Sequence, residues 1–414
     1  MKVDDECFVL SDDGLERRAL SFLADHRRRS RTQGPLVWGE GDDGAVAIWD
    51  DPDPDAERAE LDVARTYRRA RFDAGLGWLD GPVEHGGAGL DAVSQRRFAA
   101  LEAQFDTPSQ AFFKLDRVLT PILLRYAEPK IARQHVRGLF RGDVIGCELF
   151  SEPGAGSDLA SLTTKAVLDG DMWVIDGQKV WTSDAHYADI GLALCRTESQ
   201  VPGRKGVTAF LVDMRVPGVE VRPLRQITGG SSFNEVFLTG VRVPDSHRIG
   251  ARGQGWEVAQ ETLTIERTAI GVGMGRGGAG VANGERLVAL VRSLGLENDP
   301  VVRQQLAEVF MAFRAAKHLQ HVTTARHRAG DNPTASPLLA KLTLSNNLRL
   351  ASRFVTDLLG PRLAADTGEW GTFAWNQFVL GEPGMHIMAG TDEVVHNMIG
   401  EHVLGLPREP RPQP

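Results

Sequence analysis

The sequence is poor in cysteine, with three widely spaced residues in a chain of 414. Their spacing fits neither a metal site nor a disulfide framework. Such sparse cysteine favours a reducing, cytoplasmic setting. No apolar run approaches the ~20 residues that cross a bilayer, and the acidic, mixed N-terminus does not resemble a signal peptide. These absences predict a soluble, cytoplasmic protein without a membrane span.

Basic charge is also in short supply. Lysine and arginine total 47 against 55 aspartate and glutamate residues, which gives a formal net charge of −8 at pH 7. This balance argues against nucleic acid as the main partner. The hydrophobic share of 42% and the charged share of 25% are typical of a globular protein. Because the chain is longer than one core usually accommodates and shows no internal repeat, two or three packed units are expected.

Helical periodicity dominates the N-terminal third. Apolar residues recur at three- and four-residue spacing in 14–29, 91–105 and 130–142. An acidic stretch rich in Gly and Pro, residues 38–57, is predicted to be an exposed loop. The basic run His26–Arg31 is interpreted as a solvated helix end, with a phosphate-binding patch as the alternative.

A different pattern begins near residue 145, with short runs rich in β-branched and aromatic residues. Tight hairpin turns are expected at Asp169–Gly170 and Asp176–Gly177. Six runs within one region indicate a compact antiparallel β domain. The runs are 162–170, 172–183, 190–198, 206–214, 219–227 and 234–244.

Helical spacing returns from Gly253 onward. The predicted fold class is therefore α+β, with a helical domain at 1–144, a β domain at 145–248 and a helical domain at 249–414. The segment GMGRGG, Gly273–Gly278, matches the GxGxxG turn of nucleotide-binding βαβ units. It follows a helical stretch rather than a strand, so close helix packing through small residues is the better interpretation.

The stretch GCELFSEPGAGSD, residues 146–158, has the composition of a binding loop. Exposed backbone N–H groups in a Gly-rich bend bind electron-rich oxygens and ring nitrogens. Ser151, Ser157 and Ser183 add hydroxyls, and Trp181 offers a flat apolar face for stacking. A planar heteroaromatic cofactor with one polar edge fits this set. A β-domain turn beside an ordinary core tryptophan fits the spacing equally well.

Four segments together resemble the acyl-CoA dehydrogenase family: FSEPGAGSDLASL, GQKVWTS, FLVDMRVPGVEVRPLRQITGGSSFNEVFLTGVRVP and AGTDEVVHNMIGEHVLGLPRE. The likeness covers roughly residues 70–410, and the motifs follow in the family's order. It implies an acyl-CoA dehydrogenase-like fold, with an N-terminal helical domain, a middle antiparallel β domain and a C-terminal helical bundle. It also implies that the chain binds FAD, oxidises an acyl-CoA thioester to the 2,3-enoyl-CoA and passes electrons to an electron-transfer flavoprotein or a similar acceptor.

The resemblance also assigns roles to individual residues. It implies that residues 148–151 and Ser157 line the flavin and the pantetheine path, that Trp181 lies against the flavin, and that the Ser183 hydroxyl contacts flavin N5. The segments LLGP and AGTDE match those that hold the FAD adenosine and pyrophosphate across a subunit interface, which implies a tetramer. The expected cofactor contacts are Glu148, Leu149, Phe150, Ser151, Gly156, Ser157, Trp181, Thr182, Ser183, Arg292, Arg303, Gln304, Leu358, Leu359, Gly360, Gly390, Thr391 and Glu393, and the expected substrate contacts are Ser157, Arg267 and Ala389.

Two positions depart from the family's pattern. The Arg-x-x-Phe-Gly segment that contacts FAD phosphates is replaced by RSLGLENDPVVRQQLAEV, in which Arg292, Arg303 and Gln304 are the expected substitutes. His396 stands where arginine is frequent. A solvent-exposed position on a helix surface, with no role in binding, also explains either change.

The catalytic base is expected at Glu266. An α-C–H beside a thioester is a weak acid, so its removal needs a placed general base and a stabilised enolate-like oxygen. Many family members keep a glutamate before the Gly-Thr of the C-terminal motif, where this chain has Ala389. A minority branch, isovaleryl-CoA dehydrogenase-like in this respect, supplies the glutamate from an upstream helix. The matching stretch TLTIERTAIG places Glu266 there, with Arg267 beside it to orient the CoA arm or the base; a helix-surface ion pair is the alternative.

Three functions stay open at this stage. The first is an active FAD-dependent acyl-CoA dehydrogenase of lipid metabolism, acting as a homotetramer. The second is a non-catalytic subunit of a hetero-oligomer, against which Glu266 argues because such a subunit needs no relocated base. The third is a flavin oxidase or monooxygenase of the same fold, or a dehydrogenase of carrier-protein thioesters. The sequence does not specify the acyl chain: branched, steroid-side-chain and specialised-metabolite thioesters all fit.

Overall fold

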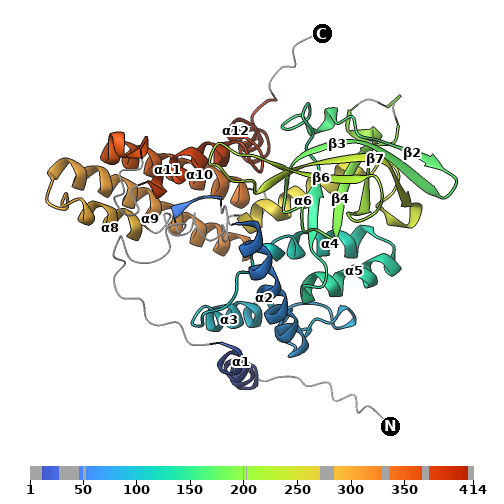
Figure 1. Cartoon of the computed structure of the whole chain (residues 1–414), viewed down its shortest axis with the longest axis horizontal. Helices are drawn as coiled ribbons and strands as arrows, with labels where there is room; N and C mark the ends of the chain where they lie inside the picture. The colour runs from blue at the N-terminus through green and yellow to red at the C-terminus, as the bar shows by residue number, and fades with distance from the viewer. Residues whose placement is uncertain are drawn as a thin grey trace.

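The computed structural model describes residues 12–27, 46–49, 53–198, 200–201, 203–270, 284–328, 335–365 and 373–408. In Figure 1 the β-sheet lies at the right, the N-terminal helices lie below it, and the bundle of long C-terminal helices extends to the left. This order of helices, strands and helices confirms the predicted α+β class. The residues of GMGRGG lie outside the described part, as do Arg28 to Arg31 of the basic run.

The N-terminal helices form where apolar periodicity predicted them. The last helix, α5, begins at Pro129, where a missing N–H costs no hydrogen bond, and ends before Gly142, whose φ of 83° is left-handed. Its buried face includes Ile131, Val136 and Leu139, which join the core beneath the sheet. The helices are α1 (Asp12–His26), α2 (Pro54–Asp73), α3 (Ala92–Glu102), α4 (Asp116–Tyr126) and α5 (Pro129–Arg141), with short 3-10 turns η2 (Val83–His85) and η3 (Ala111–Phe113).

Within the stretch 38–57, the described residues 46–49 and 53–57 do not form the exposed loop that the composition predicts. Of its described residues, Val46 and Ile48 are buried in the core of the C-terminal helices. Trp49 follows, and its indole Nε1 donates a hydrogen bond of 3.2 Å to the Gly381 carbonyl. Helix α2 already begins at Pro54. The prediction was wrong because it used the average composition of the whole stretch, which hides the short apolar run within it.

All six predicted β runs form strands. The strands are β1 (Gly146–Leu149), β2 (Lys165–Asp169), β3 (Met172–Ser183), β4 (Ile190–Arg196), β5 (Val207–Asp213), β6 (Val219–Leu224), β7 (Phe233–Pro244) and β8 (Arg248–Ile249). The order along the sheet is β6-β7-β3-β2-β4-β5-β8, with β1 on β4. The sheet is mixed rather than purely antiparallel, because β1 pairs with β4 in parallel, Glu148 opposite Leu192, and β2 touches β4 in parallel. β1 and β8 were missed because four and two residues are too short to show alternation.

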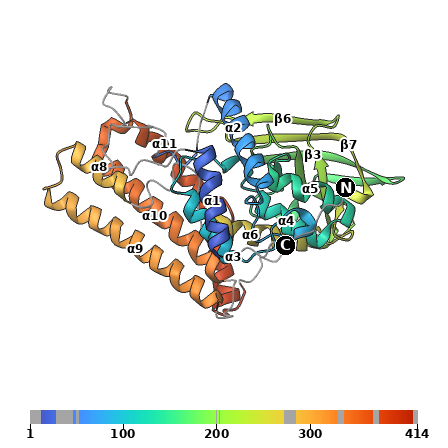
Figure 2. The same ribbon diagram turned by 90° about the horizontal axis from the view of Figure 1, so that it is seen from below.

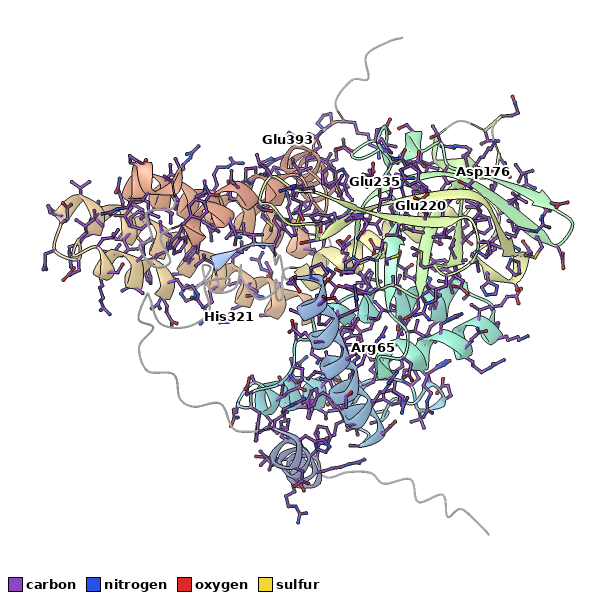
Figure 3. The ribbon with its side chains drawn as sticks, in the orientation of Figure 1. Arg65, Asp176, Glu220, Glu235, His321 and Glu393 are labelled. Atoms are coloured by element: carbon purple, nitrogen blue, oxygen red, sulfur yellow. The ribbon has the colours of Figure 1, made fainter. Side chains whose placement is uncertain are left out.

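One of the two predicted hairpin turns is wrong. Asp169–Gly170 does close the β2–β3 hairpin, with Gly170 at a φ of 66°. Asp176–Gly177 instead lies inside β3, at a register shift opposite β7. Gly177 is needed there because a Cβ would come within 2.3 Å of the Thr164 hydroxyl, and the Asp176 carboxylate (Figure 3) accepts a hydrogen bond of 2.8 Å from the Gly240 amide.

Helix α6 connects the three regions. It follows the sheet and packs against α4 of the N-terminal region, β5 of the sheet and α10 of the C-terminal bundle. The long helices α9 and α10 run side by side away from the sheet (Figure 2). None of the described helices is both long and apolar enough to span a bilayer. The C-terminal helices are α6 (Gly255–Ile270), α8 (Glu285–Ser293), α9 (Pro300–Arg328), α10 (Ala335–Leu359), α11 (Ala374–Gly381) and α12 (Asp392–Met398), with short turns η7 (Gly360–Leu363), η8 (Glu382–His386) and η9 (Ile399–Val403).

Candidate active site

The serine-rich loop after β1 and the tryptophan end of β3 lie side by side. The Val180 amide donates a hydrogen bond of 2.9 Å to the Ser151 carbonyl. The buried Lys179 ammonium donates to the Phe150 carbonyl at 3.1 Å and to the Glu152 carboxylate at 2.9 Å. The two segments singled out in the sequence therefore form one surface.

Trp181 presents an open aromatic face on this surface. Its side chain is 59% exposed, although it follows the buried Val180. Its φ of 61° is left-handed, a conformation that costs free energy in a bulky residue and is concentrated at functional sites. Phe233 of β7 packs edge-on against it, with ring centroids 5.9 Å apart, and Trp49 packs edge-on against Phe233 at 5.1 Å. This aromatic row holds the indole in place.

Hydroxyl groups flank Trp181. Thr182 is buried, and its Oγ1 has no hydrogen-bond partner within the described structure. Ser183 is half-buried and precedes Asp184, which has a left-handed φ of 62°. The Asp184 carboxylate forms an ion pair of 2.5 Å with Lys114 from the turn before α4.

Glu266 lies in the last turns of α6, half-buried, at the junction of the three regions. Burial raises the pKa of its carboxyl group, whereas the Arg267 guanidinium and the Lys114 ammonium lower that pKa. Glu148 of β1 interacts electrostatically with Glu266, and this interaction contributes to a pKa of Glu148 well above its usual range. The charges of Glu266 on α6 and of Glu148, on the strand that leads into the serine-rich loop, therefore influence each other.

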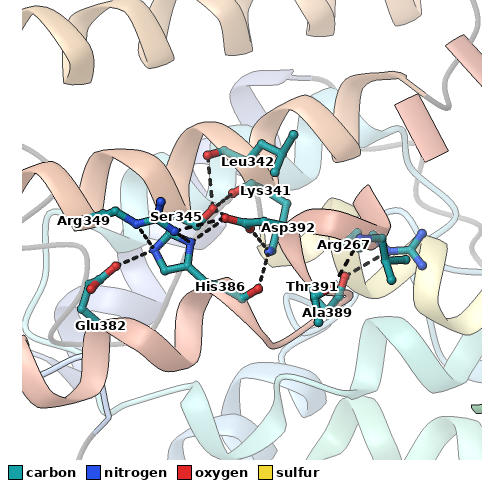
Figure 4. A network of polar contacts seen from close by, with 11 residues as sticks. Arg267, Lys341, Leu342, Ser345, Arg349, Glu382, His386, Ala389, Thr391 and Asp392 are labelled. Atoms are coloured by element: carbon teal, nitrogen blue, oxygen red, sulfur yellow. Dashed lines mark hydrogen bonds and ion pairs between the residues drawn. The ribbon is translucent and has the colours of Figure 1, made fainter. Parts of the chain in front are cut away.

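Arg267 joins α6 to the C-terminal motif. Its Nε donates a hydrogen bond of 3.3 Å to the carbonyl of Ala389 (Figure 4). Ala389 has a left-handed φ of 52° and is followed by Gly390 with a φ of 91°. Thr391 then caps α12, its hydroxyl accepting a hydrogen bond of 3.2 Å from the Val394 amide. Arg267, which follows the expected base Glu266 in the sequence, thus contacts Ala389, one of the expected substrate contacts.

A buried polar network holds the start of α12 (Figure 4). Asp392 accepts hydrogen bonds from Lys341 and, at 3.1 Å, from Ser345, both on α10. The His386 ring lies between Asp392 and Glu382, with 2.5 Å from Nδ1 to Asp392 Oδ2 and 2.5 Å from Nε2 to Glu382 Oε1. These contacts hold the Ala389–Thr391 segment against α10. The sequence did not predict this network, because its residues lie far apart in the sequence, on α10, η8 and α12.

The residues expected around the flavin differ in exposure. Leu149 and Phe150 are buried in two different cores on opposite faces of the sheet. Ser151 is half-buried, whereas Gly156 and Ser157 are exposed at the tip of the loop. On α12, Glu393 is exposed (Figure 3).

A second group of expected cofactor contacts lies elsewhere in the chain. Arg292, Arg303 and Gln304 are exposed around the α8–α9 connection, at the end of the bundle away from the sheet (Figures 1 and 2). Leu358 and Leu359 end α10, and Gly360 begins η7. Lys341, which holds the start of α12, and Leu359 are 18 positions apart on α10, about 27 Å along a helix. In a single chain the α8–α9 connection lies away from the sheet that carries Trp181 (Figures 1 and 2).

The surface around Trp181 fits an isoalloxazine ring. It offers an exposed indole face, half-buried hydroxyls at Ser151 and Ser183, and a buried Thr182 Oγ1 without a partner. A planar ring with polar edges satisfies both the apolar face and these groups. Lys114 and Asp184 were missed in the sequence because nothing in their spacing relates η3 to the end of β3.

Comparison with known proteins agrees with this geometry. The family description "Acyl-CoA dehydrogenase, middle domain" matches residues 147–241, and "Acyl-CoA dehydrogenase, C-terminal domain" matches residues 253–404. The chain is 35% identical over 357 residues to acyl-CoA dehydrogenase IpdE1 of Mycobacterium tuberculosis, covering 86% of this chain and 91% of that protein. The chain belongs to the acyl-CoA dehydrogenase family, whose members are FAD-dependent oxidoreductases acting on CH–CH groups.

Further relatives differ in length and assembly. Acyl-CoA dehydrogenase FadE34 of M. tuberculosis is 37% identical over 292 residues, which are 70% of this chain but 39% of that protein. The solved structure "Tcur3481-Tcur3483 steroid ACAD" superposes with a TM-score of 0.73 at 25% identity, covering 96% of this chain and 99% of that chain. The glutaryl-coenzyme A dehydrogenase complex with glutaryl-CoA, at 20% identity and a TM-score of 0.67, shares the fold.

Proposed function

We propose that the protein is an FAD-dependent acyl-CoA dehydrogenase that forms the 2,3-enoyl-CoA from an acyl-CoA thioester, with Glu266 as the catalytic base. The observation that carries this proposal is the position of Glu266. Its half-buried carboxylate interacts electrostatically with Glu148 of β1 and with Arg267, which contacts the C-terminal motif at Ala389, where no base is available. A helix-surface ion pair would instead leave both groups in solvent.

The chain's own residues would hold the flavin at the surface described above. Trp181 would stack on the ring, Ser183 would contact N5, and Ser151 and Thr182 would contact its polar edge. When bound, FAD supplies the acceptor for the β-hydrogen, which leaves as hydride. The Ser183 hydroxyl would stabilise negative charge that reaches the ring. The left-handed φ of Trp181 supports this role, because such strain is held where a side chain must point in one direction.

Glu266 would remove the α-proton of the thioester. Burial raises the pKa of its carboxyl group toward the working range, while Arg267 and Lys114 keep the ionised form accessible. The backbone N–H of Ala389 would polarise the thioester carbonyl, together with a hydroxyl of the cofactor. Arg267 holds this segment through its hydrogen bond to the Ala389 carbonyl, and its positive charge favours the ionised form of Glu266. Ser157, exposed at the loop tip, would line the pantetheine path.

The assembly is proposed to be a tetramer, either of one chain or of two related chains. The position of the α8–α9 connection, at the end of the bundle away from the sheet, supports this, because a second chain would supply such residues to a flavin bound at the Trp181 surface (Figures 1 and 2). Two solved structures of similar fold carry paired names, the "Tcur3481-Tcur3483 steroid ACAD" and the "ChsE4-ChsE5 complex" of M. tuberculosis. We propose a cytoplasmic location and an electron-transfer flavoprotein or a similar carrier as the acceptor.

The substrate is proposed to be a CoA thioester with a bulky acyl group, and a steroid-derived ring system is the first to test. The 25% identical structure named as a steroid acyl-CoA dehydrogenase supports this choice. The test is a panel of acyl-CoA thioesters that spans short linear, long linear, branched and polycyclic chains. Each is mixed anaerobically with the purified protein, flavin absorbance is followed, and products are identified by mass.

We expect a yellow protein whose flavin bleaches fastest with the polycyclic thioesters and yields a product two mass units lighter. Reoxidation in air should be slow and should release little peroxide. A colourless protein that binds no flavin would contradict the proposal and favour a non-catalytic subunit. Rapid peroxide release would contradict it in favour of an oxidase.

A further inference from the structure

His386 and Asp392 close the loop that carries Ala389. The His386 Nδ1 lies 2.5 Å from the Asp392 Oδ2, and the two side chains are 13% and 10% exposed. Lys341 of α10 binds both ends of the loop, because its ammonium contacts the Asp392 carboxylate and donates a hydrogen bond of 3.4 Å to the His386 carbonyl. Residues 386–392 therefore form a loop whose base is attached to α10 (Figure 4).

Within this loop, Ala389 has a backbone conformation that needs support. Its φ of 52° is left-handed, and Gly390 follows with a φ of 91°. A left-handed φ is unfavourable for alanine and persists where the surroundings hold it. Arg267 supplies one contact, a hydrogen bond of 3.3 Å to the Ala389 carbonyl. Within the described part of the chain the Ala389 N–H donates no hydrogen bond, so this N–H is available to a ligand.

The two ring nitrogens of His386 face different carboxylates. Nδ1 faces Asp392 across the loop, whereas Nε2 lies 2.5 Å from Oε1 of Glu382. Glu382 is four positions before His386 in the same turn, η8, so this second contact does not span the loop. Two cations of α10 accompany the two carboxylates: Lys341, and Arg349, whose Nε lies 3.1 Å from the His386 Nε2. The contact with Asp392 is therefore the one through which the His386 side chain closes the loop.

We propose that His386 is a positioning residue whose Nδ1–H donates to Asp392, closes the loop and thereby holds the Ala389 N–H in place for the thioester carbonyl. The inference rests on the proposed function, in which this N–H polarises that carbonyl. A short loop closed at its base has few conformations, so the donor is already in place when negative charge develops on the thioester oxygen. The contact with Glu382 has no part in this role.

Two substitutions separate the two contacts of the ring. The amide nitrogen of asparagine takes the position of the histidine Nδ1, and the amide nitrogen of glutamine takes the position of Nε2. His386→Asn therefore keeps the donor to Asp392, whereas His386→Gln keeps the donor to Glu382. Each variant is neutral and loses one of the two carboxylate contacts, so the two are matched.

Closure of the loop is tested by hydrogen–deuterium exchange of the purified holoprotein without substrate. Mass spectrometry follows the peptide that covers residues 386–392, whose amide exchange reports local opening. His386→Gln should exchange at least about tenfold faster than the wild type, and His386→Asn should stay within about twofold of it. Equal exchange of the wild type and His386→Gln would overturn the proposal.

The consequence for the reaction is tested by steady-state kinetics with the acyl-CoA thioester that reduces the wild type fastest, with rates expressed per bound flavin. His386→Gln should lower kcat at least about tenfold and leave KM within about twofold, because the Ala389 N–H acts on charge that develops during the reaction. His386→Asn should restore most of kcat. An equal loss of kcat in both variants would contradict the role assigned to the contact with Asp392.

The two proposals fail in different ways. Failure of every thioester to reduce the flavin would refute the proposed function, whereas amide exchange reports on the loop whether or not the protein turns over. If His386→Gln does not fold, His386→Asn remains the test, and faster exchange or a loss of kcat in that variant would overturn the inference.

Discussion

At the level of single residues, Lys179 joins the two segments of the candidate site. Its ammonium is fully buried and has three acceptors, the carboxylate of Glu152 and the carbonyls of Phe150 and Leu194. Glu152 in turn accepts hydrogen bonds from Thr163 and Thr164. A buried ion pair of this kind is weak evidence for stability as a whole, but removal of one partner leaves an uncompensated buried charge.

We expect Lys179→Met to lower the free energy of unfolding at pH 7 by about 3–5 kcal/mol, because Glu152 would stay buried without its cation. Urea unfolding measures this. The matched control is Asp169→Asn, which removes an exposed ion pair with Arg242 and should change stability by less than about 1 kcal/mol. Equal effects of the two variants would contradict the role assigned to Lys179.

The same pair predicts a dependence of stability on pH. The interaction with Lys179 and the Thr164 contacts hold the pKa of Glu152 at about 2 against a usual value of 4.5. A carboxyl group whose pKa is lower in the folded than in the unfolded protein contributes stability at pH values above its unfolded-state pKa. This contribution is lost as the pH falls through the folded-state pKa. The stabilisation should therefore decline between about pH 4.5 and pH 2 in the wild type. Glu152→Gln should flatten this decline in acid-unfolding curves. An unchanged decline would contradict the assignment of this pH dependence to Glu152.

Backbone strain is concentrated in the candidate site. Among the described residues, the non-glycine residues with a left-handed φ are Trp181, Asp184 and Ala389. Each of these conformations costs roughly 1–3 kcal/mol and persists when the surroundings over-determine it. None was foreseen, because tryptophan and alanine rarely adopt a left-handed φ, and aspartate tolerates one but is too common in other conformations to signal it.

At the level of elements, periodicity predicted much of the fold. Runs rich in β-branched and aromatic residues gave the six longer strands, since such side chains pack well on a pleated, buried surface. The parallel pairing of β1 escaped prediction because it depends on a partner 44 positions away, Gly146 opposite Ile190. The segment 46–49 escaped for a similar reason: its burial depends on the C-terminal helices, which its own composition does not report.

That segment gives an element-scale prediction. Trp49 connects the C-terminal bundle, through Gly381, to Phe233 and thereby to Trp181. Trp49→Ala should lower the free energy of unfolding, measured with urea, by about 2–4 kcal/mol through lost packing. Trp49→Phe keeps a ring in the row and should lose less than half as much stability. Identical behaviour of the two variants would show that the aromatic row does not support Trp181.

At the level of the whole molecule, the candidate site combines three regions. The sheet supplies Trp181 and Ser183, α6 supplies Glu266 and Arg267, and the C-terminal motif supplies Ala389. The motifs predicted these groups and their roles by resemblance, but not the contacts that join them. The Arg267–Ala389 hydrogen bond and the Glu148–Glu266 interaction arise only when α6 packs against both the sheet and α10.

The arrangement of the whole chain also limits which of the expected FAD contacts a single copy brings together. The residues around the α8–α9 connection were expected to hold a distant part of FAD, and this connection lies away from the sheet that carries Trp181 (Figure 1). No local pattern in a sequence reports a contact between subunits, so this part of the prediction depended on family resemblance alone.

The measurement that tests the central claim most directly is anaerobic stopped-flow reduction of the bound flavin in wild type and in Glu266→Gln. Both proteins are mixed with the thioester that reduces the wild type fastest. The account predicts that both bind flavin equally, that the wild type bleaches, and that Glu266→Gln bleaches at least about 100-fold more slowly because its amide cannot accept the α-proton. Bleaching of Glu266→Gln at a rate close to that of the wild type would contradict the assignment of the base and the mechanism built on it.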